Sequence, residues 1–509
     1  MNLLKSGIIV TLLTLFSRIF GFAREVSFAS IFGTNQIADC VNIAFKFPNL
    51  FRRILGEGAL STVFIPIYSK KLVASQKEAH KFSSEIFIML TLMLICLTCI
   101  LQILMPFLII LIAPGFLYNN EKYNLTITLC RITLPYVIFI SITALFGGML
   151  NSIRKFFAFA FVPIIMNICV LSILYLTKEI IKPHYSISYS LIISGIMQTI
   201  FMYFCLHKAG LKFSIALNFT DPDVKILIQR MGPATLSAGA QQINLFIAQS
   251  IASFLPRAIS ILSYADRLYQ LPLSLVGVTF STILLPELSK LYKNHNYIEA
   301  NLLQNKAIKI AIIISIPTMF GLLTLSQMIV NLIYERGAFS LNDTQLTANA
   351  LSILSFGLPA FTLVKILNPI FYANLDTKTP AKISLHSIII NIILNIVLAF
   401  NYSHLGIAMG SSITAWINFW LLKQHAKKIA NFTISHDTKT LSVKVIICSL
   451  IMYLVILILL KYFVQLYYLT SILITKIIIL FGIITVAIIV FTISAYLFNI
   501  HKILFIEKY

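Results

Sequence analysis

Apolar runs of about twenty residues recur along the whole chain, and this feature limits its possible folds more than any other. Clear examples are residues 82–112, 186–206, 443–460 and 477–498. Each run can cross a hydrocarbon core about 30 Å thick as an α-helix. Only 11% of the 509 residues are charged, whereas soluble domains carry about a quarter. The sequence therefore predicts an all-α polytopic membrane protein in contact with membrane lipids.

Basic residues are distributed unevenly among the loops that join these runs. The net charge of +22 could by itself suggest a nucleic-acid partner. However, most lysines and arginines lie in every second connection, and the other connections hold only Lys122, Lys178, Lys182, Arg257, Arg336, Lys461 and Lys476. By the positive-inside rule the richer set faces the cytoplasm. We therefore expect about fourteen spans, both termini in the cytoplasm and no nucleic-acid partner.

The chain repeats itself at an offset of about 220 residues. Three matches occur in the same order: residues 61–70 (STVFIPIYSK) with 281–290 (STILLPELSK), Leu134-Pro135 with Leu358-Pro359, and Asn167 with Asn391. The repeat predicts an N-lobe over residues 1–210 and a C-lobe over residues 225–425, each with six spans. An even number of spans gives both lobes the same orientation, related by a pseudo-twofold axis along the membrane normal. Residues 440–509 supply two additional C-terminal helices.

Charged side chains cluster in the first two predicted spans, although one at the centre of a span costs about 2.5–3.5 kcal/mol on insertion scales. Span one contains Arg18, Arg24 and Glu25. Span two carries residues three and four apart, which places them on one helix face: Asp39, Asn42, Lys46, Asn49 and Arg53. Within span two, Pro48 removes the hydrogen bond to the carbonyl of Ala44 and kinks the helix.

Cations outnumber acids around this cluster and its counterpart in the second half. Arg18, Arg24, Lys46, Arg52, Arg53 and Arg267 stand against Glu25, Asp39, Glu57 and Asp266. The planar guanidinium fork suits phosphate and stays charged when partly desolvated. We therefore expect an anionic ligand in a water-filled cavity between the lobes. In the alternative interpretation, Arg24 or Lys46 pairs with Glu25 or Asp39 and simply holds the helices together.

Residue patterns typical of an enzyme are absent from the sequence. The histidines are scattered, no pair has metal-ligand spacing, and no Gly-rich phosphate loop precedes a predicted helix. We therefore expect no catalytic residues, no metal and no cofactor. Two similar lobes around a cavity are typical of transporters that rock between two states. Such transport would draw its energy from a monovalent cation gradient, the membrane potential or a partner.

Several motifs of this chain resemble those of the MurJ/MviN family of bacterial lipid II flippases over essentially the full length. They are Ser17-Arg18, Arg24-Glu25, KFPNLFRR at 46–53, GEGA at 56–59, DRLYQ at 266–270 and ERGAF at 335–339. The resemblance implies the fold of the multidrug/oligosaccharidyl-lipid/polysaccharide (MOP) exporter superfamily, as in the MATE transporters. It also implies that residues 440–509 form a groove for the polyprenyl tail.

The resemblance further implies a transporter of the cytoplasmic (inner) membrane that moves lipid II from the inner to the outer leaflet by alternating access. We expect its headgroup to contact Arg18, Arg24, Lys46, Asn49, Arg52, Arg53 and Arg267, supported by Glu25, Asp39, Glu57 and Asp266. Some relatives carry a sodium site with acidic residues in spans seven and eleven. No carboxylate lies in those spans here, which leaves ion coupling open.

Three alternative functions remain. A flippase for polysaccharide precursors of the O-antigen type would recognise the same pyrophosphate. A multidrug antiporter needs carboxylates or aromatic surfaces for cationic drugs, and an arginine-rich cavity would repel them. A membrane-embedded glycolipid transferase would need a poised carboxylate or histidine pair.

Overall fold

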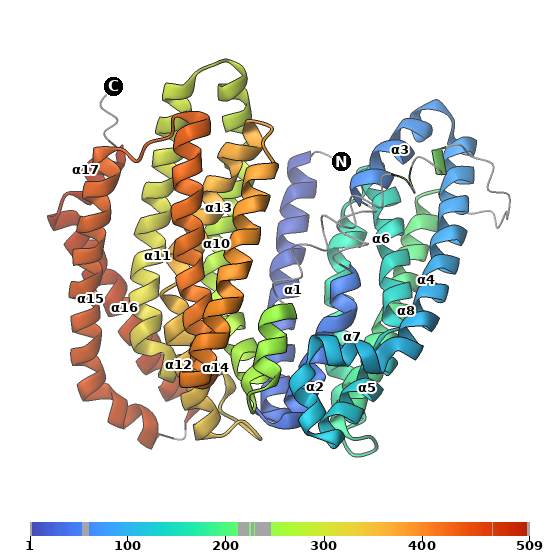
Figure 1. Cartoon of the computed structure of the whole chain (residues 1–509), viewed down its shortest axis with the longest axis horizontal. Helices are drawn as coiled ribbons and strands as arrows, with labels where there is room; N and C mark the ends of the chain where they lie inside the picture. The colour runs from blue at the N-terminus through green and yellow to red at the C-terminus, as the bar shows by residue number, and fades with distance from the viewer. Residues whose placement is uncertain are drawn as a thin grey trace. The chain divides into compact units, whose positions relative to one another are not determined.

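The computed structural model describes residues 3–52, 61–211, 223–224, 227, 229, 246–470 and 472–505. These residues are helical, with turns between the helices and no β-strand among them (Figure 1). The all-α prediction is therefore confirmed. The chain divides into two compact units, residues 1–260 and residues 261–509.

The first unit is a bundle of long helices, and most of its chain reversals are short. Its elements are α1 (Leu3–Phe32), α2 (Gln36–Phe51), α3 (Ser61–Ala74), α4 (Gln76–Ile112), the 3-10 helix η2 (Pro114–Tyr118), α5 (Asn120–Thr133), α6 (Tyr136–Ser152), α7 (Phe157–Leu176) and α8 (Pro183–Lys208). Helix α7 packs against both α1 and α8, and α2 packs against α5. The site residues of this unit lie on α1, α2, α5 and α7.

The second unit is also a bundle of long helices. Its elements are α10 (Ala258–Lys293), whose first turn belongs to the first unit, α11 (Tyr297–Tyr334), α12 (Leu341–Ser355), α13 (Leu358–Ala373), α14 (Lys378–Ala430), α15 (His436–Leu469), α16 (Leu473–Leu497) and α17 (Ile500–Phe505). Helix α11 packs against α12, α13 and α15, and α15 packs against α16. The two C-terminal helices therefore attach to this unit through α11.

Matching breaks mark the repeat in the two units. In the first unit Leu134-Pro135 separates α5 from α6, because proline has no N–H and cannot continue the hydrogen-bond ladder. In the second unit Leu358-Pro359 begins α13 after a bend of 44° from α12. The long helices before these breaks also match, since α4 has 37 residues and α11 has 38.

Helix α14 is a hairpin of two arms. Ser403 breaks it with φ 53° and ψ −137°. Contacts across the break pair Asn391 with Thr414 by a hydrogen bond of 3.2 Å, and the backbone at Gly410 lies against Asn395 with no space for a Cβ. The two arms therefore run antiparallel.

Before the hairpin, the pKa of Asp376 lies below its ordinary value because the Thr379 side chain and the backbone amides of Thr379 and Lys378 donate hydrogen bonds to its carboxylate.

Long apolar helices make the protein multi-pass. Among the described residues, eight helices are long and apolar enough to cross a membrane, or nine if the bent α12–α13 pair counts as one span. In this count the α14 hairpin is one helix. The predicted number of fourteen therefore stays a prediction, because parts of the chain around residues 53–60 and 212–245 lie outside the described residues.

Candidate functional site

Arg24 is buried in the first unit and has a fixed orientation. Its Nη1 donates to Asn167 Oδ1 on α7 at 2.8 Å, and its Nη2 lies 2.9 Å from Glu25 Oε1. The guanidinium carbon stands 4.7 Å from the centre of the Phe45 ring, a distance at which a cation is attracted to the ring face. Arg24 is 5% exposed, so helix α1 presents this arginine inside the bundle and not toward lipid.

Asn167 contacts helix α1 at two places, Arg24 and Ser17. Its Oδ1 accepts from Arg24, and its Nδ2 donates to the carbonyl of Ser17 at 3.2 Å. A Cβ at Gly21 would lie 3.4 Å from that same Nδ2, so the small residue lets the asparagine lie close to α1. The sequence marked Asn167 only as part of the repeat. A single amide in an Ile-rich span was the signal that it forms an interhelical contact.

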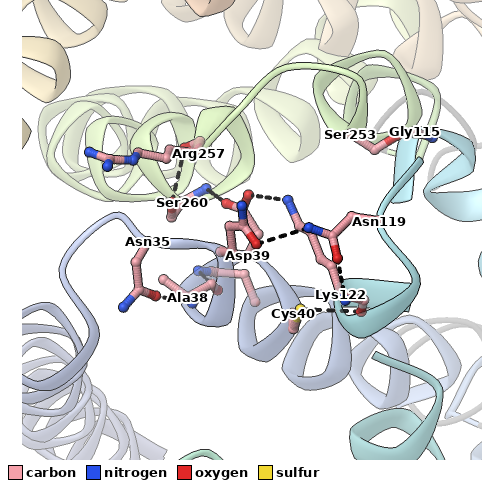
Figure 2. Close-up of polar contacts among 12 residues, drawn as sticks. Asn35, Ala38, Asp39, Cys40, Gly115, Asn119, Lys122, Ser253, Arg257 and Ser260 are labelled. Carbon is pink, nitrogen blue, oxygen red and sulfur yellow. Dashed lines mark hydrogen bonds and ion pairs between the residues drawn. The ribbon is translucent and has the colours of Figure 1, made fainter. Parts of the chain in front are cut away.

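Asp39 lies in the first turn of α2 and has an unexpected partner. Its Oδ2 is 2.8 Å from Lys122 Nζ on α5, and both side chains are buried, at 0% and 9% exposure (Figure 2). Lys122 Nζ also stands 4.0 Å from the centre of the Phe116 ring. In the alternative interpretation, Arg24 or Lys46 pairs with Glu25 or Asp39. The structure contains the Arg24–Glu25 pair, whereas a pairing of Asp39 with Arg24 or Lys46 is wrong, because Asp39 binds a lysine expected in a loop.

The same carboxylate also binds the beginning of α10. Asp39 Oδ1 accepts from the backbone N–H of Ser260 at 2.9 Å (Figure 2). Ser260 is the third residue of α10, and the first N–H groups of a helix have no partner within the helix. A negative charge there is also favoured by the helix dipole. Asp39 therefore satisfies one ammonium and one helix N-terminus at once.

The rest of the predicted stripe on α2 is partly buried. Asn49 Oδ1 accepts from Arg52 Nε at 3.2 Å, and Asn49 Nδ2 donates to the carbonyl of Phe45 at 2.9 Å. Asn42 is half-buried, whereas Lys46 is exposed. Asn49 therefore fixes the guanidinium of Arg52 at the end of the helix.

Pro48 has the local effect that its residue type predicts. The carbonyl of Ala44, four residues earlier, accepts a hydrogen bond of 2.9 Å from the buried hydroxyl of Thr133 on α5. The proline thus leaves this carbonyl available, and a neighbouring helix uses it. This contact holds the middle of α2 against the end of α5.

In the second unit, α10 carries the remaining predicted residues. Asp266 is half-buried and accepts a hydrogen bond from Gln270 one turn later, and Arg267 is exposed. In the first unit, Arg18 is exposed on α1. Arg53 and Glu57 lie outside the described residues. Within the described part of the chain, no group of three or more His, Cys, Asp or Glu side chains could hold a metal ion.

Comparison with known proteins gives consistent matches. The sequence model of the family described as lipid II flippase MurJ matches residues 28–479. A probable lipid II flippase MurJ of Rickettsia prowazekii is 53% identical over 452 residues, which is 89% of each chain. The lipid II flippase MurJ of Burkholderia cenocepacia is 31% identical over 83% of each chain.

Solved structures agree with the sequence comparison. A lipid II flippase MurJ in an inward closed conformation superposes with a TM-score of 0.78 and 30% identity, covering 97% of this chain and 100% of that one. An inward-facing MATE transporter of the MOP superfamily superposes with a TM-score of 0.68 at 13% identity, which shows the fold alone. The MOP/MATE-like fold expected from the sequence is confirmed. By sequence and by structure, this chain belongs to the lipid II flippase MurJ family.

Proposed function

We propose that this chain moves lipid II, the polyprenyl-pyrophosphate-linked peptidoglycan precursor, from the inner to the outer leaflet of the bacterial cytoplasmic membrane. Membership of the MurJ family supports the substrate, and the multi-pass fold supports a transporter. The alternating positive charge of the loops supports cytoplasmic termini. The function is thus transport by alternating access, with lobes at 1–210 and 225–425 and no chemical step.

The observation that carries the proposal is the arrangement around Arg24. A guanidinium that is 5% exposed is held by Asn167 on one side and by Glu25 on the other. Glu25 balances this charge while the site is empty. In the proposed mechanism a pyrophosphate oxygen competes with Glu25 for Nη2, because a phosphate accepts charge-assisted hydrogen bonds as a carboxylate does.

Further cations complete the proposed site. Arg52, oriented by Asn49 through the 3.2 Å bond to its Nε, is a second proposed ligand of the pyrophosphate, and Arg267 is proposed to contact the headgroup during its passage. Arg18, Lys46 and Arg53 contribute positive charge to the path of the headgroup, with Asp39, Glu57 and Asp266 as supporting acids. Neutralisation of the arginines by the ligand then allows the lobes to close and to reopen on the opposite side.

The experiment measures lipid II flipping in vesicles that contain purified protein. Loss of a charge-assisted hydrogen bond costs about 1.5–3 kcal/mol, so Arg24→Ala is expected to lower the rate at limiting lipid II about 10- to 100-fold. Arg24→Lys keeps the positive charge but lacks the planar guanidinium fork. Its flipping rate is expected to lie between those of the wild type and Arg24→Ala. Arg336→Ala, in an exposed loop, is the matched control. Wild-type flipping by both Arg24 variants would exclude Arg24 from the site.

Depletion of the protein in growing cells tests the substrate. Lipid II is expected to accumulate on the inner leaflet. Accumulation of a polysaccharide carrier lipid instead would show that the substrate is the alternative pyrophosphate lipid.

We further propose that a monovalent cation gradient or the membrane potential drives transport, since moving one charge across 100 mV supplies about 2.3 kcal/mol. Collapsing the potential with a potassium ionophore, at constant ion gradients, is expected to slow flipping if the potential is the driver. Collapsing the sodium gradient alone, or the proton gradient alone, tests each of these two ions as the driver. Unchanged flipping in all three conditions would exclude a gradient as the source of energy.

A further inference from the structure

Buried polar side chains continue from Arg24 through α7 to α6 and α8. They are Arg24, Asn167, Tyr136 and Gln198, with exposures of 5%, 4%, 0% and 1%. All four lie in the first unit, and Tyr136 is close enough to Arg24 and Arg52 to interact with them electrostatically. The mechanism proposed above involves Arg24 and Asn167 but neither Tyr136 nor Gln198. Burying a polar group is costly unless it is hydrogen-bonded, so the partners of these two side chains decide where they lie.

Gln198 joins α8 to both of its neighbouring helices. Its Nε2 donates to the carbonyl of Val162 on α7 at 3.0 Å, and its Oε1 accepts from the Tyr136 hydroxyl on α6 at 3.3 Å. The same hydroxyl stands 3.6 Å from Met166 Sδ on α7. Helix α8 packs against both α6 and α7. One amide and one hydroxyl therefore connect three helices.

A glycine on α8 permits this arrangement. A Cβ at Gly195 would lie 2.8 Å from Tyr136 Cδ2, which is too close for any side chain. Gly195 is three residues before Gln198, so the two residues are neighbours on one face of α8. The ring of Tyr136 can therefore lie against the backbone of α8 while its hydroxyl reaches the Gln198 amide.

The bond from Gln198 reaches α7 at a weak point of that helix. Pro163 follows Val162 within α7 and has no N–H, so it cannot donate to the carbonyl of Phe159 in the preceding turn. A proline inside a helix is also the usual place for a bend. The Gln198 amide therefore fixes α7 where a backbone hydrogen bond is missing.

Asn167 lies on the turn of α7 that follows this point. Val162 and Met166 are four residues apart, so they share the face of α7 that contacts α6 and α8. Asn167 is the next residue and projects about 100° further round the helix, where it binds Arg24 on α1 at 2.8 Å. A rotation or bend of α7 at this turn would therefore move the amide that holds the guanidinium.

We propose that Gln198 and Tyr136 are positioning residues for the headgroup of lipid II, an inference that rests on the function proposed above. Their hydrogen bonds fix residues 162–167 of α7, and this turn holds Asn167 and hence Arg24 in the orientation that receives the pyrophosphate. A preorganised group binds more tightly because it loses less freedom on binding. Loss of either contact therefore weakens the binding of lipid II and preserves the maximal rate of flipping.

The test measures flipping by the full-length protein in vesicles over a range of lipid II mole fractions. Gln198→Met keeps the length of the side chain and removes both of its hydrogen-bonding groups. The half-saturating mole fraction of lipid II is expected to rise about 3- to 10-fold, the effect of one lost hydrogen bond. The maximal rate is expected to stay within about twofold of the wild-type rate, because binding alone has changed. Tyr136→Phe is expected to act in the same direction.

Double variants show whether the effect passes through Asn167. In the Asn167→Leu background, Gln198→Met is expected to change the half-saturating mole fraction by less than about twofold, because the contact through which it acts is already missing. Thr143→Val is the matched control. It removes the 3.2 Å hydrogen bond between Thr143 and Thr199, which also joins α6 to α8 but does not reach α7. This control is expected to leave the half-saturating mole fraction unchanged in both backgrounds.

Two results would overturn the inference. One is a wild-type half-saturating mole fraction in Gln198→Met. The other is an equal fold-change in the wild-type and Asn167→Leu backgrounds, which would mean that Gln198 only stabilises the helix bundle. If Gln198→Met is not recovered as a folded protein, Tyr136→Phe, which lacks a single oxygen, replaces it in the same cycle.

Arg24→Ala in the same assay separates this inference from the proposed function. Normal flipping by Arg24→Ala would count against the proposed pyrophosphate site itself. Impaired flipping by Arg24→Ala, together with additive effects of Gln198→Met and Asn167→Leu, would refute only the positioning role of Gln198 and Tyr136.

Discussion

The buried pair of Asp39 and Lys122 allows a quantitative prediction. The carboxylate is 0% exposed and the lysine 9% exposed, with 2.8 Å between Oδ2 and Nζ. Removing one partner of such a pair leaves an uncompensated charge and costs about 3–5 kcal/mol. For a unit of this size, about 2 °C of apparent melting temperature corresponds to each kcal/mol. Lys122→Met is therefore expected to lower the apparent melting temperature by about 6–10 °C.

The double variant decides whether the loss arises from the unpaired charge. Asp39→Asn combined with Lys122→Met removes both charges, and the asparagine keeps an oxygen for the Ser260 N–H. Its melting temperature, followed by circular dichroism in detergent, is expected to recover at least half of the loss. Lys178→Met is the control, because the side chain of that lysine is exposed. Additive losses in the double variant would refute the reasoning.

Three further predictions concern single contacts. Asn167→Leu removes the acceptor of Arg24 Nη1, so lipid II flipping is expected to fall about tenfold for a lost charge-assisted bond of about 1.5 kcal/mol; normal flipping would contradict its positioning role. Thr133→Val leaves the Ala44 carbonyl without its donor and is expected to destabilise the protein by about 1–3 kcal/mol in thermal melts, whereas Thr133→Ser is not. Ser403 has φ 53°, so Ser403→Val is expected to lower stability by about 1–2 kcal/mol and Ser403→Gly to preserve or raise it; equal melting of both variants would argue against strain at this residue.

Local patterns in the sequence predicted the features that depend on neighbouring residues. Apolar runs predicted the long helices, because the length and hydropathy of a span depend only on consecutive residues. The Leu-Pro pairs predicted equivalent positions in the two units, and they stand at equivalent breaks. Pro48 predicted an available carbonyl at Ala44, where Thr133 now donates. In each case the cause lies within a few residues of its effect.

Contacts between distant residues could not be predicted in the same way. Lys122 is 83 residues from Asp39, and Asn167 is 143 residues from Arg24. The loop position assigned to Lys122 followed from hydropathy, which does not report that the first turn of α5 is packed against α2. Likewise the sequence places Asp39 and Lys46 on one polar face of α2, whereas in the structure Asp39 is buried and Lys46 is exposed. The depth of a side chain in the bundle depends on the packing of other helices.

The amide of Asn167 has a consequence for affinity. An arginine side chain that orders only when its ligand arrives loses about 1.5–2 kcal/mol of rotamer entropy at that moment. Arg24 has already lost this freedom, because Asn167, Glu25 and the Phe45 ring fix its guanidinium when the protein folds. In the mechanism proposed above, an incoming anion therefore meets a preorganised arginine, and more of its interaction energy is available for binding.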